Sequence, residues 1–135
     1  MSMSKICVIE DDKGLAEIYQ TLLTTAGFTV VVANDGAAGL KLVEDTLPDL
    51  VLLDLMLPEL SGYDVLKGMR TSEWGRDIKV IMLTNISETE APDGIEQLGF
   101  SRYIVKANLV SNKLPDICTE VISEAPQDSV EIKAL

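Results

Sequence analysis

The feature that most constrains the fold is the sequence Leu-Val-Leu-Leu at residues 50–53, which is followed by Asp54. Such a short, unbroken apolar run is typical of a strand that is buried on both faces, as the strands of parallel sheets are. A charged residue directly after a buried strand is not a packing residue. It either pairs with a cation or faces a crevice, and open α/β sheets bind ligands at the carboxyl ends of their strands. Asp54 is therefore the first candidate for a functional residue.

Four more apolar runs predict the remaining strands of a five-stranded parallel sheet. They cover residues 6–9, 28–33, 80–83 and 103–105. Between them, and after the last, apolar residues recur at the spacing of amphipathic helices. Strands that alternate with helices favour an α/β fold with helices on both faces of the sheet, a doubly wound architecture. With 135 residues, the chain is long enough for one such domain and too short for two.

The first and fourth predicted helices carry the most specific expectations. The inward stripe of the first helix includes Ile18, and Asp12 precedes the helix as its cap. The segment 87–98 is the weakest helix, because Pro92 cannot lie inside a helix and Gly94 destabilises one. We expect its helical part to begin near Pro92 and to be short.

The charge balance excludes several kinds of chemistry. The net charge is −11 and the chain contains no histidine. So acidic a chain argues against a nucleic-acid partner, because phosphates require lysine and arginine. Without histidine there is no Ser-His-Asp or Cys-His nucleophile, no histidine-ligated zinc and no phosphohistidine on this chain.

The cysteines and the hydropathy pattern favour a cytoplasmic location. Cys7 and Cys118 form no Cys-x-x-Cys pair and fall in an apolar strand and a helix, so we expect buried thiols in a reducing compartment. Residues 1–4 are too short and polar for a signal peptide, and no apolar run approaches membrane-spanning length. We therefore expect no membrane partner.

Polar residues with functional potential follow four of the predicted strands. They are Glu10, Asp11, Asp54, Thr84 and Lys106. Because the carboxyl ends of parallel strands share one edge of the sheet, these residues are expected to converge. Three carboxylates in one crevice repel each other unless a cation lies among them, and an all-oxygen set suits Mg²⁺. With the lysine as a second positive charge, the cluster predicts a pocket for a phosphoryl group attached to one of the acids.

These strand ends together resemble the receiver domain of two-component response regulators, of the stand-alone, CheY-like kind. The matching motifs are Val8-Ile9-Glu10-Asp11-Asp12, Leu53-Asp54-Leu55-Met56-Leu57-Pro58 with Ser61-Gly62-Tyr63, Leu83-Thr84, and Tyr103-Ile104-Val105-Lys106. The resemblance covers residues 5–125 as the receiver domain and leaves 126–135 as a C-terminal tail, in which Val130 and Ile132 alternate like a short strand. It implies a flavodoxin-like sheet with strand order 2-1-3-4-5.

The resemblance also implies the cofactor and the phosphoryl acceptor. Asp54 would accept the phosphoryl group. Mg²⁺ would be bound by Asp54, by Asp11 directly, by Glu10 through water, and by the backbone carbonyl of Met56. Each assignment is carried onto the residue of this chain that matches the family's motif.

Three further residues have implied roles in catalysis and switching. Thr84 and Lys106 would each contact a phosphoryl oxygen and so complete the catalytic set with Asp54. Thr84 would then move toward the phosphoryl group and vacate space for the ring of Tyr103. This pair would act as the switch that changes a partner-binding face.

Some residues depart from the usual receiver pattern. Lys106 is followed by Ala107 instead of proline, so the peptide bond between them is either trans with a shifted loop or a strained cis bond. Asn85 replaces a small residue and narrows access to Asp54. Met56 and Ile86 occupy the two positions best placed to orient a hydrolytic water, and both are apolar. We therefore predict slow hydrolysis of the phosphorylated form.

Three functions remain in competition. The first is a phospho-accepting module of a phosphorelay, which is not a dedicated enzyme. Its partners would be a downstream protein target and either a sensor histidine kinase or a histidine phosphotransfer protein. The module would be a monomer or a phosphorylation-dependent dimer. The second is a pseudo-receiver that is never phosphorylated and acts as a scaffold, which Ala107 and Asn85 leave open. The third is an aspartyl phosphatase, which needs a general acid where Met56 stands.

Overall fold

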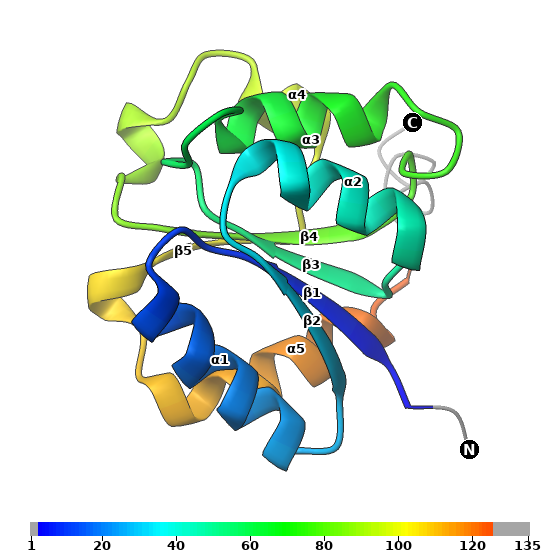
Figure 1. The fold of residues 1–135 in the computed structure, drawn as a ribbon. Coiled ribbons are helices and arrows are strands. Elements are labelled where there is room, and N and C mark those ends of the chain that lie inside the picture. Colours follow the sequence, from blue (N-terminus) through cyan, green and yellow to red (C-terminus); the bar gives the residue numbers. More distant parts are fainter. Residues whose placement is uncertain (1–2, 126–135) are drawn as a thin grey trace.

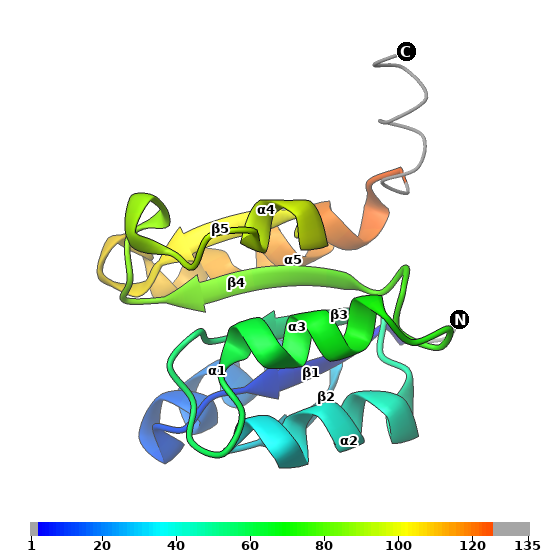
Figure 2. The same cartoon turned by 90° about the horizontal axis from the view of Figure 1, so that it is seen from above.

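A computed structural model of the chain describes residues 3–125, which form one parallel sheet of five strands in the order β2-β1-β3-β4-β5. The strands are β1 (Lys5–Ile9), β2 (Thr29–Ala33), β3 (Leu50–Leu53), β4 (Lys79–Thr84) and β5 (Arg102–Val105). Figure 2 shows this order from above. The doubly wound, flavodoxin-like fold and its strand order are confirmed.

The helices cover both faces of the sheet, as Figure 1 shows. They are α1 (Lys13–Thr25), α2 (Gly36–Thr46), α3 (Gly62–Arg70), α4 (Ile95–Leu98) and α5 (Leu114–Ser123). Helices α1 and α5 lie on one face, here called the α1/α5 face. Helices α2, α3 and α4 lie on the other, here called the α2/α3/α4 face. No helix among the described residues is both long and apolar enough to span a membrane.

The alternation of side chains along each strand divides the apolar residues into two cores. In β3, Leu50 and Leu52 pack on the α1/α5 face, whereas Val51 and Leu53 pack on the α2/α3/α4 face. All four are buried, as expected of a central parallel strand. The two cysteines divide in the same way. Cys7 is buried in the core on the α2/α3/α4 face and Cys118 in the core on the α1/α5 face, and both are free thiols.

The orientation of α1 differs from the sequence expectation. Asp12 caps the helix as predicted, because its side chain accepts a hydrogen bond from the Leu15 amide. Ile18, however, is half exposed, and Tyr19 is buried in its place; Leu23, which also belongs to the predicted stripe, is buried as expected. The spacing of positions 15, 18 and 22 is the same as that of positions 16, 19 and 23. The apolar pattern alone therefore does not distinguish the two faces, which are one residue apart.

The fourth helix is shorter than predicted. Glu88–Glu90 form a 3₁₀ turn, and α4 begins only at Ile95, after Gly94 in the left-handed conformation (φ 89°). The predicted start near Pro92 is therefore wrong by about one turn. Gly94 has no Cβ and adopts this conformation without strain, so the helix starts after the glycine and not at the proline.

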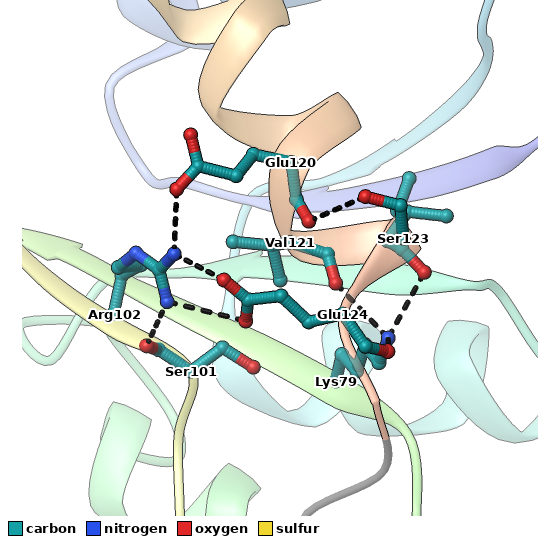
Figure 3. Close-up of polar contacts among 8 residues, drawn as sticks. Lys79, Ser101, Arg102, Glu120, Val121, Ser123 and Glu124 are labelled. Atoms are coloured by element: carbon teal, nitrogen blue, oxygen red, sulfur yellow. Dashed lines mark hydrogen bonds and ion pairs between the residues drawn. The ribbon is translucent and has the colours of Figure 1, made fainter.

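The carboxyl end of α5 is anchored to the beginnings of β4 and β5 (Figure 3). The Lys79 ammonium donates hydrogen bonds to the carbonyl oxygens of Val121 (3.0 Å), Ile122 (2.9 Å) and Glu124 (2.6 Å). Arg102 pairs with the Glu124 carboxylate and, at 2.9 Å, with the carboxylate of Glu120, which lies one turn earlier in α5. A cation at the carboxyl end of a helix satisfies carbonyls that have no partner within the helix. The predicted tail, 126–135, lies outside the described residues.

Candidate functional site

The carboxylates of Glu10 and Asp54 come together because β1 and β3 are neighbours. Ile9 at the end of β1 is in register with Leu53 at the end of β3, and the Asp54 amide continues the ladder with a hydrogen bond to the Ile9 carbonyl (3.2 Å). Each acid stands two residues after a strand residue that packs on the α1/α5 face, Val8 and Leu52. The period of a strand therefore directs both acids to that face.

Lys106 joins these two carboxylates. Its Nζ lies 2.6 Å from Oδ2 of Asp54 and 2.5 Å from Oε1 of Glu10. All three side chains are nearly inaccessible, with exposed fractions of 10% for Lys106, 3% for Glu10 and 6% for Asp54. One buried ammonium group thus partly neutralises two buried carboxylates, which would otherwise repel each other.

Backbone amides hold the remaining carboxylate oxygens. The Met56 amide donates to Oδ1 of Asp54 (3.0 Å), and the Asp12 amide donates to Oε2 of Glu10 (3.0 Å). The side-chain amide of Asn34 in addition donates to the Glu10 carbonyl (2.9 Å). Every oxygen of the two buried carboxylates therefore has a donor, and both groups are fixed in orientation.

Asp11 completes a set of acids that suits a metal ion. Its side chain is exposed, and ligand oxygens of Glu10, Asp11 and Asp54 all lie within 4.8 Å of one another. Carboxylate oxygens are the ligands that Mg²⁺ prefers in proteins. The donor set therefore fits a magnesium ion, which would enter from the exposed side where Asp11 lies.

Burial and charge shift the pKa values of this cluster. Burial raises the pKa of Glu10, and although Lys106 and the Asp12 amide lower it, the net direction is upward. For Lys106, burial lowers the pKa, but the hydrogen bonds and charges of Asp54 and Glu10 raise it more, so that the ammonium form is favoured. Both groups therefore depend on each other to stay charged inside the protein.

The loop after Asp54 is held close to the site by glycine. A Cβ on Gly62 would lie 2.1 Å from the Asp54 carbonyl oxygen, so no larger residue fits there without moving the backbone. The Gly62 amide also donates to the Leu55 carbonyl (2.9 Å). This close contact holds the loop 55–61 against the end of β3. Met56, in this loop, is 62% exposed.

Thr84 and Tyr103 lie on the opposite face of the sheet from the carboxylates. Met82 in β4 packs on the α2/α3/α4 face, so Thr84, two residues later, points the same way; it is completely buried. The Tyr103 ring packs on the same face, and its hydroxyl donates to the carbonyl oxygen of Ile86 (2.7 Å). The predicted switch pair therefore shares one face, and Tyr103 already holds the loop that follows β4.

The departures from the receiver pattern have clear positions. The Lys106–Ala107 peptide bond is trans, and Lys106–Asn108 form a 3₁₀ turn directly after β5. Asn85 is exposed. The amide of Ile86 faces the hydroxyl of Thr84 at 3.5 Å.

Sequence reasoning missed one residue at this site. Tyr19 of α1 lines a small space together with Glu10, Asp54 and Leu83. The apolar pattern of α1 predicts Ile18 as the inward residue and therefore does not bring Tyr19 to the site. The useful signal was a tyrosine in phase with Ala16 and Leu23, since a buried tyrosine hydroxyl usually has a polar partner.

Comparison with known proteins identifies the family. A family model described as the response regulator receiver domain matches residues 6–116. DltR, a transcriptional regulatory protein of Streptococcus agalactiae (strain NEM316), is 44% identical over 103 residues, which are 76% of this chain and 45% of DltR. The transcriptional regulatory protein CpxR of Escherichia coli K12 is 41% identical over 105 residues, or 77% of this chain and 43% of CpxR.

Solved structures support the same fold. The receiver domain of the sensor histidine kinase PA1611 from Pseudomonas aeruginosa PAO1, determined with a magnesium ion in its active-site cleft, has a TM-score of 0.81 and 25% identity; the match covers 91% of this chain and all of that domain. The chemotaxis protein CheY4 of Vibrio cholerae has a TM-score of 0.80 at 22% identity, covers 89% of this chain and 99% of CheY4, and supports the fold alone.

These relatives correct the prediction that excluded nucleic acid. DltR and CpxR are transcriptional regulatory proteins, and the chain spans less than half of the length of each. The acidic charge of one such segment does not decide what the whole of a regulator binds, so the exclusion drawn from net charge is wrong as a statement about partners. The family match and the two relatives nevertheless agree on what this segment is: the chain belongs to the response regulator receiver domain family.

Proposed function

We propose that the chain accepts a phosphoryl group on Asp54 and uses it to change a partner-binding surface. The observation that carries this proposal is the contact of one ammonium group, that of Lys106, with both Asp54 and Glu10, at the place where the oxygen of Asp11 is also within reach. This arrangement puts a nucleophile beside a fixed positive charge and beside a set of metal ligands.

The reaction would be an in-line transfer to the Asp54 carboxylate. One carboxylate oxygen forms a bond to phosphorus while the bond from phosphorus to the donor breaks, and the leaving group keeps the bonding electron pair. The Met56 amide already holds Oδ1, which orients the carboxylate for attack. The Lys106 ammonium, now bonded to Oδ2, would follow the negative charge onto a phosphoryl oxygen.

The residues that would hold Mg²⁺ are Glu10, Asp11, Asp54 and the carbonyl of Met56. When bound, the ion would supply positive charge that neutralises the phosphoryl oxygens during transfer. The likeness to the PA1611 receiver domain, whose cleft coordinates magnesium, supports this assignment.

The signal would leave the site through Thr84 and Tyr103. The buried Thr84 hydroxyl now accepts a hydrogen bond from the Ile86 amide at 3.5 Å, and a phosphoryl oxygen on Asp54 would offer the hydroxyl proton a charged acceptor. Movement of Thr84 would change the space beside Tyr103, whose hydroxyl now holds the Ile86 carbonyl. The loop 85–94 and the short α4 would then shift.

The phosphoryl donor would be a sensor histidine kinase or a histidine phosphotransfer protein, since the chain itself has no histidine. A downstream protein target would read the altered face. The similarity to DltR and CpxR points to transcription as the process under control. Exchange with such a kinase would require a location in the cytoplasm, which agrees with two free thiols.

Intact-mass measurement after incubation with acetyl phosphate and Mg²⁺ tests the proposal. The wild type should gain the mass of one phosphoryl group, and Asp54→Asn should gain none, because an amide is no nucleophile here. Asp45→Asn, an exposed acid on α2, is the matched control and should behave as the wild type. A wild type that gains no mass although it binds Mg²⁺ would instead support the scaffold function.

A further inference from the structure

Asn34 lies at the carboxyl edge of the sheet beside the acids, and the proposed phosphoryl transfer does not involve it. It directly follows β2, the strand next to β1, and its side chain is partly buried. Its Nδ2 atom donates a hydrogen bond to the carbonyl oxygen of Glu10 (2.9 Å). Because a carbonyl oxygen can only accept, this contact also fixes which end of the Asn34 amide faces Glu10. Asn34 therefore contacts the backbone that carries Glu10 and Asp11.

This contact continues the β1–β2 ladder by one step beyond the end of β2. Ile9 pairs with Ala33, the last residue of β2, and the Glu10 amide donates to the Ala33 carbonyl (3.0 Å). A longer β2 would next offer a backbone amide to the Glu10 carbonyl. The chain instead turns into α2, whose N-cap is Asp35, and the Asn34 side chain supplies the donor. The amide and the carbonyl of Glu10 are thus both held by the end of β2.

The turn that carries Asn34 is itself fixed by the loop that follows β3. The Gly36 amide donates to the carbonyl oxygen of Pro58 in this loop (3.0 Å). A Cβ on Gly36 would lie 1.8 Å from another backbone oxygen of the same loop, so the turn and the loop are in direct contact. The turn 34–36 therefore connects the loop after β1 with the loop after β3, and these two loops supply the proposed magnesium ligands.

Asp11 is the proposed magnesium ligand whose position depends most on the backbone. The carboxylates of Glu10 and Asp54 are held by Lys106 and by backbone amides. The Asp11 side chain is exposed, and no hydrogen bond or ion pair in the described part of the chain restrains its carboxylate. The peptide group between Glu10 and Asp11, whose oxygen Asn34 holds, therefore restrains the direction of the Asp11 side chain. Because Mg²⁺ requires nearly ideal octahedral geometry, a rotation of this peptide group would weaken the site.

We propose that Asn34 is a positioning residue of the magnesium site, whose side-chain amide fixes the peptide group between Glu10 and Asp11 and so keeps the Asp11 carboxylate within reach of the ion. The inference rests on the proposed function. Asn34 touches neither the ion nor the phosphoryl group. Without its amide the Glu10 carbonyl loses a partner and the peptide group can rotate, so that binding of the ion has to order Asp11 first.

Asn34→Ala removes the donor, and the affinities of the full chain for Mg²⁺ and Ca²⁺ measure its role. We expect the dissociation constant for Mg²⁺, from calorimetric titration, to rise about three- to tenfold, the equivalent of one hydrogen bond. Ca²⁺ accepts irregular geometry, so its dissociation constant should rise less than about twofold. Asn112→Ala, in an exposed 3₁₀ turn before α5, is the matched control and should change neither constant.

Asn34→Asp keeps the shape of the side chain and removes the donor. Its added negative charge attracts both ions, so the ratio of the two dissociation constants is the quantity to compare, and it should shift by the same factor as in Asn34→Ala. A second measurement needs no metal, because the Asp11 amide belongs to the peptide group that Asn34 holds. In the metal-free protein, ¹⁵N relaxation of this amide should give the order parameter of rigid backbone in the wild type and a lower one in both variants.

The outcomes separate the two proposals. An unchanged dissociation constant for Mg²⁺ in Asn34→Ala, an equal rise for Mg²⁺ and Ca²⁺, or an Asp11 amide that stays as rigid as in the wild type overturns the role of Asn34. A wild type that gains no phosphoryl mass from acetyl phosphate, together with the expected changes in Mg²⁺ affinity, would refute the proposed function and retain the role of Asn34. A wild type that binds no Mg²⁺ refutes both.

Discussion

Replacement of Lys106 by methionine should destabilise the protein strongly without Mg²⁺ and much less with it. The ammonium lies 2.6 Å from Asp54 and 2.5 Å from Glu10, and all three side chains are nearly inaccessible. Removal of one partner from a buried ion pair leaves uncompensated charge and costs about 3–5 kcal/mol. Because Lys106 retains a little exposure, water can reach the vacated space, so we expect a loss of about 3 kcal/mol at neutral pH.

The metal should restore part of this loss, because Glu10 and Asp54 belong to the proposed magnesium site. An ion that binds only the folded state adds about 2.7 kcal/mol when its concentration is 100 times its dissociation constant. In the wild type the ion competes with Lys106, so the same Mg²⁺ concentration should stabilise Lys106→Met more than the wild type. The free energy of unfolding from urea titrations followed by circular dichroism, with and without Mg²⁺, measures both effects.

A matched control is available on the surface. Lys41 pairs with Asp45 at 3.4 Å, but the two side chains are 75% and 54% exposed, so Lys41→Met should cost no more than about 0.5 kcal/mol, independent of Mg²⁺. If Lys106→Met were as stable as this control, or if Mg²⁺ stabilised it no more than the wild type, the ammonium would not be what neutralises the two acids.

Three further predictions concern other parts of the molecule. Met56→Asn, alone or with a polar residue in place of Ile86, should shorten the lifetime of the phosphorylated form severalfold, because a polar side chain can orient the attacking water; an unchanged decay in Mg²⁺, followed by intact mass, would show that these positions do not limit hydrolysis. Burial raises the pKa of both Cys7 and Cys118 to about 12, so neither thiol should react with iodoacetamide at pH values well below that until urea unfolds the chain; fast labelling of the native protein would contradict their burial. Lys79→Met should cost about 2 kcal/mol by urea titration, because three carbonyls at the end of α5 lose a charged donor, and hydrogen exchange should rise there first; exchange that rises uniformly instead would argue against a local anchor.

The sequence predicts the position of a functional residue where the neighbouring residues allow only one structural interpretation. Asp54 follows four buried apolar residues, and this alone placed it at the carboxyl edge of the sheet. The convergence with Glu10 and Lys106 then followed from the rule that parallel strands end at the same edge. Which acid the lysine contacts depends on side-chain geometry, and the contact of Lys106 with both acids could not be read from spacing.

The errors arose where two local patterns fit the same residues. The stripe of α1 that contains Ile18 and the stripe that contains Tyr19 both repeat every three or four residues, and a tyrosine is polar enough to be assigned to the surface. In the fourth helix, Pro92 and Gly94 are both plausible start signals, and the left-handed conformation of the glycine decided the outcome. Tertiary packing therefore selected the buried face of α1, whereas the backbone conformation of Gly94 set the start of α4.

The division of the site between two faces of the sheet has a consequence for how the protein can evolve. The acids and Lys106 lie on the α1/α5 face, and Thr84 and Tyr103 lie on the α2/α3/α4 face. A signal between them has to pass around the rim of the sheet, through the few residues that follow the carboxyl end of each strand. Substitutions deep in either core would then change the free energy of unfolding and leave signal transmission unaffected. Substitutions at the rim would change signal transmission and leave the stability of the fold unaffected. Stability and signalling can therefore be selected almost independently.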